Sequence, residues 1–444
     1  MNLNPRLSRR QFLTACSAMT AAIALSACAA PAANAPASGG AAPAAQANQD
    51  INFLVRTDIR KAYAADEAIK AWSKDHEAKV IIDEPAGEVD AKIQAAQAAG
   101  DLVWDGFAVI EGPWSIKQWV DRHLIQPLDD LIATSKIAGA DKVVPAIIPS
   151  VLESSKHDGK QYTIPGNVGS IALGWYTEPL KKAGVEAPTT WDEVRAAAEK
   201  VKATSPDLTP YDCACSPLCD MMGMIWGATD TPITKDGLVD WQGEASVASL
   251  KWFQAMVKDG LMPGIHTDSF GNWLKGGTAI MSSFDVHGTM AQQAFGADKA
   301  STGINIRREK DKPAGGAPFW LNGSVVLNKA KNPQGMMDFL LWWFGPDNKA
   351  TGKQIATVAA KPAYQYTYDE FIKPDKTQAW QLDGIELVRN SVPFPSNLFW
   401  GAQNKVLTPW IQKAVNPDNK MSAEEALDGA MKDLKKEMDD MLKQ

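Results

Sequence analysis

The chain has 444 residues, of which 45% are hydrophobic and 22% are charged, as is usual for a globular protein. Its formal net charge of −7, without any basic stripe, argues against nucleic acid as a partner. A chain of this length usually forms two domains or more, and no apolar run after residue 28 is long enough to span a membrane.

The first 28 residues are typical of an export signal. Residues 8–13 (SRRQFL) look like a twin-arginine signal, and a short run of small and apolar residues follows from Ala15 to Ala24. This run is too short for a membrane anchor, which needs about 20 apolar residues. Residues 25–28 (LSAC) resemble a lipobox, so we expect residues 1–27 to be removed and Cys28 to be lipidated. The mature protein would then be held by lipid outside the cytoplasmic membrane, in the periplasm or at the cell surface.

The segment after the signal, residues 28–49, is nearly all Ala, Pro, Gly, Ser, Asn and Gln. Such a composition cannot bury a core, so it predicts a flexible tether between the lipid and the folded body. Removing residues 1–27 takes away three arginines and no acid, which changes the formal net charge from −7 to −10.

Strands and helices alternate in the first part of the folded region. Ile51 to Val55 is predicted to be a buried strand, Ala62 to His76 a helix, and Lys79 to Asp83 a second strand. Val89 to Ala99 is predicted to be a helix and Asp101 to Trp104 a strand. This alternation is typical of an α/β fold with a mostly parallel sheet that helices cover on both faces.

The alternation resumes further along the chain. Ile171 to Tyr176 reads as a strand, and Thr190 with Glu193 forms a capping box that opens a helix to about Lys202. The remaining predicted elements are helices at 245–258 and 333–344, strands at 278–282 and 324–328, and a C-terminal helix opened by a second capping box at 422–425.

Residues 159–193 carry a specific family pattern. They read Gly-Lys-x-Tyr-x-x-Pro (159–165), then a strand with a tyrosine at 176, then Pro-x-Thr-Trp-Asp-Glu at a helix start (188–193). This block resembles the extracellular solute-binding proteins that feed ABC importers, and most of all the branch typified by maltose-binding protein. Residues 276–281, 322–328 and 393–410 resemble the same branch, and the resemblance covers most of residues 51–440.

The resemblance implies a periplasmic-binding-protein type II fold, with two α/β lobes joined by three hinge crossings. We place the crossings near residues 168–173, 320–324 and 371–377. Lobe one would comprise residues 51–168 and 323–372, and lobe two residues 173–320 and 376–444. The ligand would lie in the cleft between the lobes, and hinge closure would bury it. The implied partners are a small-molecule carbohydrate and the transmembrane subunits of an ABC permease, and we expect a monomer.

A carbohydrate site needs aromatic planes for the apolar faces of the sugar, and the chain has 16 tryptophans. Trp400 matches a ligand-facing aromatic position of the maltose branch; the alternative is that it packs the last helices. Trp320 lies at an expected crossing, where hinge packing is the alternative. Of Trp175 and Tyr176 only one can face the cleft, because side chains alternate along a strand. Trp191, the first residue inside a capped helix, is expected to be structural.

Polar side chains must pair with the sugar hydroxyls. Arg56 and Asp58 follow the first predicted strand, and ligands of open α/β sheets bind beyond the carboxyl ends of strands. Glu111 and Trp114 follow a later strand in the same way. For Arg56 and Asp58 the alternative is a solvated turn.

Asp285 and His287 are further candidates, because they follow the predicted strand at 278–282. The maltose branch commonly has a glycine and a tryptophan in this stretch, so its usual aromatic residue cannot be carried over. This departure leaves the identity of the sugar open. It also keeps a non-sugar solute, such as a polyamine, glycerol phosphate or a metal ion, as the alternative ligand.

Three cysteines, Cys213, Cys215 and Cys219, lie within seven residues of one another. A single disulfide with one spare thiol is one interpretation, and we take Cys213 and Cys219 as the pair. Free buried thiols are the second. A thiolate metal site is the third, although zinc needs four ligands and neither a histidine nor a fourth cysteine lies nearby.

Motifs of catalysis are missing from the sequence. The five histidines match no metal motif such as H-E-x-x-H, and neither a G-x-S-x-G nor a G-x-x-x-x-G-K-[ST] pattern occurs. We therefore expect a protein without cofactor, metal or enzymatic activity. It would capture a mono- or oligosaccharide and deliver it to a membrane permease.

Overall fold

The computed structural model describes residues 49–443, except 85–88, 110–112, 214–216, 265–267, 297, 304, 311–317, 358–360, 379–380, 383–388, 390–393, 395–398 and 419. The predicted export signal, Cys28 and all but the last residue of the predicted tether lie outside the described residues. In the described part of the chain, no helix has the length and apolar character needed to cross a membrane.

A mixed nine-stranded sheet runs through the molecule. Its strands follow the order β2-β1-β3-β10-β6-β8-β7, and β11 and β9 also pair with β6. The strands of the sheet are β1 (Ile51–Val55), β2 (Val80–Asp83), β3 (Gly106–Val109), β6 (Ile164–Tyr176), β7 (Thr209–Cys213), β8 (Thr278–Phe284), β9 (Ala300–Thr302), β10 (Phe319–Val326) and β11 (Lys361–Pro362). A separate small hairpin consists of β4 (Lys156–His157) and β5 (Lys160–Gln161).

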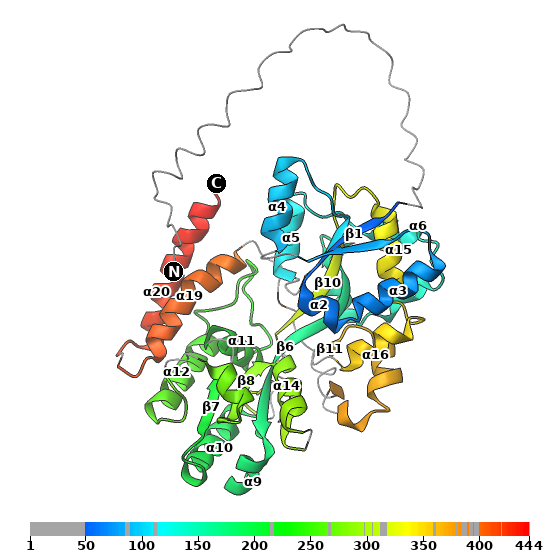
Figure 1. Cartoon of the computed structure of the whole chain (residues 1–444). Helices are drawn as coiled ribbons and strands as arrows, with labels where there is room; N and C mark the ends of the chain where they lie inside the picture. The colour runs from blue at the N-terminus through cyan, green and yellow to red at the C-terminus, as the bar shows by residue number, and fades with distance from the viewer. Residues whose placement is uncertain are drawn as a thin grey trace, which may run out of the picture. The chain divides into compact units, whose positions relative to one another are not determined.

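Strand β6 is shared by two halves of this sheet (Figure 1). From Ile164 to Ser170 it pairs with β10, and within that stretch it also pairs with β11. From Ile171 onward it pairs with β8 and β9 instead. The change of partners therefore falls between Ser170 and Ile171. We call the part built on β1, β2, β3, β10 and β11 the first lobe, and the part built on β7, β8 and β9 the second lobe.

Helices from two stretches of the chain cover the first lobe. They are α2 (Thr57–Ala62), α3 (Ala65–Asp75), α4 (Val89–Ala99), α5 (Pro113–Asp121), α6 (Asp129–Thr134), α7 (Ala140–Val143), α8 (Pro149–Ser154), α15 (Pro333–Trp343), α16 (Lys349–Thr357) and α17 (Gln365–Thr367). Short 3-10 helices span Val144–Ala146 and Lys376–Gln378, and a π-helix spans Tyr368–Ile372. The apolar residues of β1 and α15 are buried in the core between the sheet and the helices of this lobe. Phe53, Phe339 and Trp343 pack against one another in this core.

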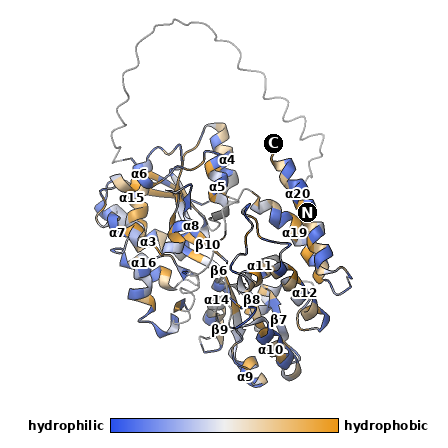
Figure 2. Cartoon of the chain, turned by 180° about the vertical axis from the view of Figure 1, so that it is seen from behind, coloured by the Kyte–Doolittle hydropathy of each residue, from blue (hydrophilic) through white to orange (hydrophobic). Residues whose placement is uncertain are grey.

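The second lobe has its own core under a second set of helices. They are α9 (Thr177–Ala183), α10 (Trp191–Thr204), α11 (Pro217–Ala228), α12 (Glu244–Lys258), α13 (Ser269–Leu274), α14 (Asp285–Phe295), α19 (Trp400–Val415) and α20 (Ala423–Met441). Helix α20 buries one side, which includes Leu427 and Leu434, against this core. In Figure 2, α20 carries both hydrophobic and hydrophilic residues along its length, as expected for a helix that buries one side.

The two predicted capping boxes are confirmed at the starts of α10 and α20. The helix predicted over 62–76 was wrong at its start: Ala64 adopts a left-handed conformation with φ 50°, and two helices, α2 and α3, meet there. The strand predicted at 101–104 was also misplaced. Val103 is 49% exposed, and the strand forms at 106–109, where Gly106 lets the backbone approach Val325 closely.

Candidate functional site

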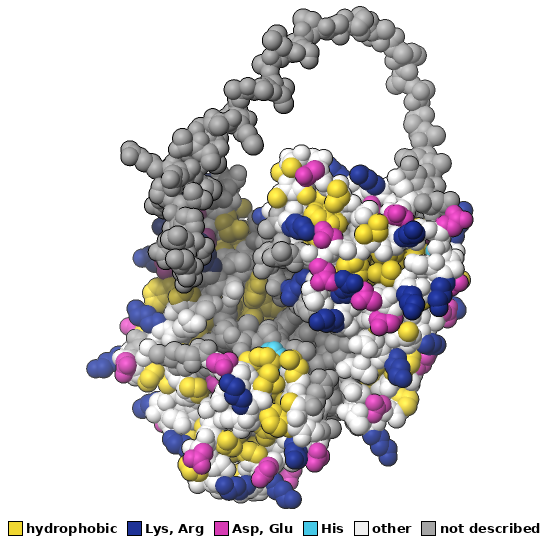
Figure 3. Space-filling model, viewed as in Figure 1, with side chains coloured by type: hydrophobic (Ala, Val, Ile, Leu, Met, Phe, Trp, Pro, Cys, Tyr) yellow, Lys and Arg dark blue, Asp and Glu magenta, His cyan; other side chains and the backbone are white. Residues whose placement is uncertain are grey.

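The carboxyl ends of β1 and β2 carry a polar cluster of the first lobe. Figure 3 shows Lys and Arg side chains interspersed with Asp and Glu side chains over the visible face of this lobe. The Thr57 hydroxyl donates to Glu84 Oε2 at 2.6 Å, and the Arg60 guanidinium pairs with Glu84 and, at 2.7 Å, with Asp66. The hydrogen bonds from Thr57 and Arg60 lower the pKa of Glu84, and the hydrogen bond to Asp66 raises that of Arg60. Glu84 and Arg60 are therefore both charged near neutral pH, and their contacts hold them in place as acceptor and donor.

The predicted candidates of the first lobe lie on the elements that follow these strands. Arg56 is the half-buried N-cap residue of α2. Asp58 lies within α2 and Trp114 within α5, but their side chains are outside the described part. Glu111 lies wholly outside the described residues.

His287 lies in the first turn of α14 in the second lobe. Its ring stacks on Phe270 with 4.0 Å between ring centroids, and its Nδ1 shares a hydrogen bond with the Ser283 hydroxyl. Burial lowers the pKa of His287 to about 4. The imidazole is therefore neutral at neutral pH, which suits hydrogen bonding to an uncharged hydroxyl rather than attraction of an anion.

Asp285 lies at the start of α14 and is buried at the point where the lobes meet. Its Oδ2 accepts a hydrogen bond from Lys361 Nζ at 2.7 Å, and its Oδ1 accepts one from the backbone N–H of Ser170 at 3.3 Å. Lys361 Nζ also donates to Ser170 Oγ at 2.7 Å. We call Ser170, Asp285 and Lys361 the hinge cluster. Both carboxylate oxygens of Asp285 thus have protein partners.

Further hydrogen bonds join β6 to β10, and β10 to the segment before α19. Asn322 Nδ2 of β10 donates to Asn167 Oδ1 of β6 at 2.7 Å, and both asparagines are buried. Among the described residues, Asn322 Oδ1 has no hydrogen-bond partner. The backbone N–H of Phe394 donates to the carbonyl of Phe319 at 3.0 Å, which ties the segment before α19 to the start of β10.

The aromatic candidates lie mainly on the second lobe. Trp400 is the first residue of α19, is half-buried and meets Phe394 edge-on with 4.4 Å between ring centroids. Trp175 is half-buried against the second-lobe core, whereas Tyr176 is buried and donates its hydroxyl proton to the Trp273 carbonyl at 2.7 Å. Trp320 lies in β10 opposite Gly169, with its side chain outside the described part. Of Trp175 and Tyr176 on β6, Trp175 is therefore the one that stays partly accessible.

Cys213 is a free, buried thiol, which corrects the predicted bridge between Cys213 and Cys219. Its side chain lies inside the second-lobe core at the end of β7, beside Tyr211 and Asp220, rather than on an accessible loop. Burial raises the pKa of the thiol well above its usual value. Cys219 lies in α11, with its side chain outside the described part, and Cys215 is outside the described residues.

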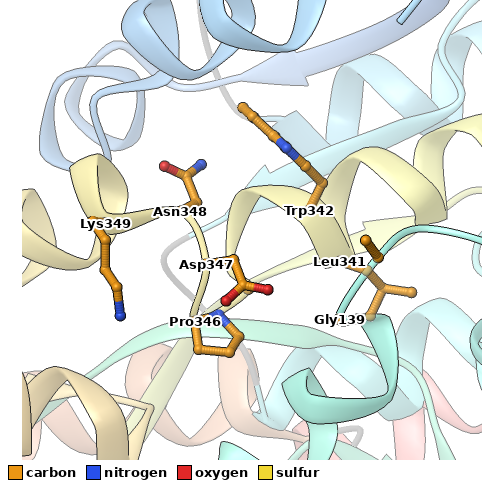
Figure 4. A pocket seen from close by; sticks show the side chains of 9 residues that line it. Gly139, Leu341, Trp342, Pro346, Asp347, Asn348 and Lys349 are labelled. Carbon is orange, nitrogen blue, oxygen red and sulfur yellow. The ribbon is translucent and has the colours of Figure 1, made fainter. Parts of the chain in front are cut away.

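A separate pocket of about 170 Å³ lies on the first lobe between α7 and the segment that links α15 to α16. In Figure 4 the side chains of Trp342 and Asn348 point one way, and those of Asp347 and Lys349 point the other way. The polar groups therefore do not converge on the indole, and none of the predicted site residues lines this pocket. Within the described ranges, no group of three or more His, Cys, Asp or Glu residues could hold a metal ion.

The structure brings Asp285 to the hinge and places Arg56 beside the polar cluster, while Trp400 and Trp175 lie on different elements of the second lobe. Sequence reasoning missed Arg60, Glu84, Ser170 and Lys361. Arg60 follows the end of β1, the same strand end that singled out Arg56 and Asp58, so the same argument from position could have included it. Lys361 lies in a two-residue strand and carries no motif.

The sequence of the chain matches that of a known protein family. The family model for bacterial extracellular solute-binding proteins matches residues 67–377. A probable sugar-binding periplasmic protein of Rhizobium meliloti is 33% identical over 113 residues, which are 25% of this chain and 24% of that protein. The chain therefore matches about a quarter of the length of this relative.

Solved structures share the fold over most of the chain. An ABC substrate-binding protein of Listeria monocytogenes, in complex with cycloalternan, has a TM-score of 0.70 and 19% identity, covering 88% of this chain and 99% of its own. The sugar-binding protein MalE of Xanthomonas citri has a TM-score of 0.71 and 15% identity, covering 89% and 99%. The expected two-lobe α/β fold is thereby confirmed. With its family match spanning residues 67–377, the chain belongs to the bacterial extracellular solute-binding proteins.

Proposed function

We propose that the protein is the substrate-binding lipoprotein of an ABC importer and captures a mono- or oligosaccharide between its lobes. The observation that carries the proposal is the family match over residues 67–377, on a fold whose two lobes share one continuous strand, β6. The Rhizobium meliloti relative is named a probable sugar-binding periplasmic protein, and the Xanthomonas citri neighbour is named a sugar-binding protein. The Listeria monocytogenes neighbour was solved in complex with cycloalternan. The bound sugar would pass unchanged to the permease.

The chemistry of the candidate site supports an uncharged ligand. In the first lobe, Thr57, Arg60 and Glu84 present donors and acceptors that are already paired with one another. In the second lobe, His287 is neutral and Trp400 keeps part of its indole accessible. Paired charges and neutral rings bind hydroxyl groups without needing a counter-ion, whereas a charged solute would require an unbalanced charge. Arg56, Asp58, Glu111, Trp114, Trp175 and Trp320 remain proposed contacts.

A thermal-shift screen of the full chain tests the ligand class. The panel contains mono- and oligosaccharides, with polyamines, glycerol phosphate and divalent metal ions beside them. We expect at least one sugar to raise the melting temperature in a saturable way. A shift with a charged solute, and none with any sugar, would refute the carbohydrate proposal. Mass spectrometry of the sugar after incubation should return the same mass, and a changed mass would show catalysis instead.

The anchoring part of the proposal rests on the residues around Cys28. Lipid on this cysteine would keep the receptor close to its permease, and the tether would let the body turn toward it. In a bacterial host, the wild-type chain should fractionate with the membrane, and the Cys28→Ser variant should not. Equal fractionation of both chains would remove lipidation at Cys28 from the account.

A further inference from the structure

The hinge cluster contains the most deeply buried ion pair in the described part of the chain. The side chains of Lys361 and Asp285 are 4% and 1% exposed, and 2.7 Å separates Nζ from Oδ2. The other ion pairs of the described residues have at least one partner that is about a third exposed or more. An ion pair removed from water in this way is worth little as a general stabiliser, so its place in the fold needs another reason.

The three residues of the cluster belong to three elements and to both lobes. Lys361 is on β11 of the first lobe, Asp285 opens α14 of the second lobe, and Ser170 is the last β6 residue that pairs with the first lobe. Both charged side chains bond to Ser170, one through its hydroxyl and one through its backbone N–H. The ion pair is therefore attached to the hinge strand at the residue where the strand changes partners.

A rotation of one lobe against the other moves atoms in proportion to their distance from the axis. Contacts on the hinge strand itself move least. Breaking the contact between Lys361 and Asp285 would separate two opposite charges that are buried side by side, which costs far more than shifting an exposed contact. Closure that preserves this pair is consequently the path of lowest cost.

We propose that Ser170, Asp285 and Lys361 form a fixed pivot, which stays intact during lobe closure and limits the lobes to one direction of rotation. Asp285 also opens the helix whose first turn carries His287. The pivot thus holds His287 at a constant place relative to the first lobe. Asp285 acts as a positioning residue in this account and not as a contact to the ligand.

The test compares inter-lobe distances in full-length chains without ligand. Spin labels on non-natural amino acids replace exposed Lys74 of α3 and exposed Lys200 of α10, one on each lobe. The pivot variant is Lys361→Met with Asp285→Asn, which removes both charges and keeps an oxygen for the Ser170 N–H. We expect the distance distribution to be clearly broader in the pivot variant than in the wild type.

The control variant removes an exposed pair of the same charge types within the second lobe, Lys405→Met with Glu437→Gln, whose atoms lie 2.6 Å apart. It should leave the distribution unchanged. The same distribution in the wild type and the pivot variant would overturn the proposal. If circular dichroism shows the pivot variant to be unfolded, Ser170→Ala decides in its place, with a smaller broadening expected and no broadening overturning the proposal.

A binding measurement extends the test and rests on the proposed function. With the sugar that gives the largest thermal shift, the pivot variant should bind about tenfold more weakly, because less of the protein is in the binding-competent arrangement. Unchanged affinity would contradict the positioning of His287 through Asp285. If no sugar binds the wild type, the proposed function fails, while the ligand-free distances still decide on the pivot.

Discussion

Trp400 is the residue whose replacement reports most directly on the aromatic part of the site. We expect Trp400→Ala to weaken sugar binding by about 1–3 kcal/mol, because a stacking plane for the sugar ring is lost. Its core contact to Phe394 is edge-on, so the loss of this indole leaves the Phe394–Trp226 stack in place. Titration calorimetry measures the effect.

The matched control for this prediction is Trp410→Ala in the same helix. Trp410 packs on Gly429 and donates to Asp433 of α20, so its loss affects helix packing and no proposed ligand contact. The affinity of the Trp410→Ala variant for the sugar should remain within about twofold of the wild-type affinity, because a change at an independent site should hardly affect binding. Equal losses in the two variants would remove Trp400 from the binding site.

His287 links the site to the pH dependence of stability. Its pKa is about 4 in the folded chain and near 6.5 when unfolded, because burial disfavours the charged ring. Between these values the unfolded state binds a proton that the folded state does not bind. The contribution of His287, about 1–3 kcal/mol, is therefore present above pH 6.5 and is lost as the pH falls toward 4.

Urea unfolding of the wild type and of His287→Asn checks this sign. At pH 7.5 the variant lacks the Phe270 stack and the Ser283 hydrogen bond, so it should be less stable than the wild type. The difference should shrink at pH 5, because only the wild type loses the contribution of a neutral buried imidazole. A difference that stays constant or grows would show that the ring is not kept neutral by burial.

At the scale of elements, removing the capping box of α10 should lower the free energy of unfolding by a measurable amount. Thr190 Oγ1 accepts from the Glu193 N–H at 3.2 Å, and Glu193 Oε2 accepts from the Thr190 N–H at 3.2 Å. Thr190→Ala should lower the free energy of unfolding by about 1 kcal/mol. Thr204→Ala, in the last turn of the same helix, should change it by less than about 0.5 kcal/mol. Urea midpoints compare the two, and equal values would contradict a capping role for Thr190.

Elements with a local signal were predictable from the sequence, and elements decided by distant contacts were not. The capping boxes at Thr190 and Ser422 involve residues three positions apart, so their pattern is visible in the chain itself. The location of β3 depends on pairing with β1 and β10, which the apolar run at 101–104 cannot show. The two-residue strand β11 has too few residues for any periodicity.

The same distinction applies to the candidate site. Position after a strand end singled out Asp285 and His287, but it could not show that Asp285 faces a lysine 76 residues away. The pivot proposal gives Asp285 a positioning role, and its role as a ligand contact stays a prediction that the binding measurement on the pivot variant addresses. Arg60 and Glu84 escaped prediction because their role depends on two strands being neighbours in the sheet.

At the scale of the whole molecule, the two-lobe fold was predictable because residues 159–193 carry a long family pattern across the first crossing. In the structure this block contains β6, where the sheet changes from one lobe to the other. Neither composition nor periodicity would have shown that two cores share one strand. The identity of the proposed sugar lies beyond such a pattern, since it would depend on side chains that converge from both lobes.

Small-angle scattering of the full chain, titrated with each sugar and each charged solute of the panel, tests the central claim most directly. Capture between hinged lobes predicts that one sugar reduces the radius of gyration, with saturation at one sugar per chain. A radius that no sugar changes, together with a contraction caused by a charged solute, would contradict the account.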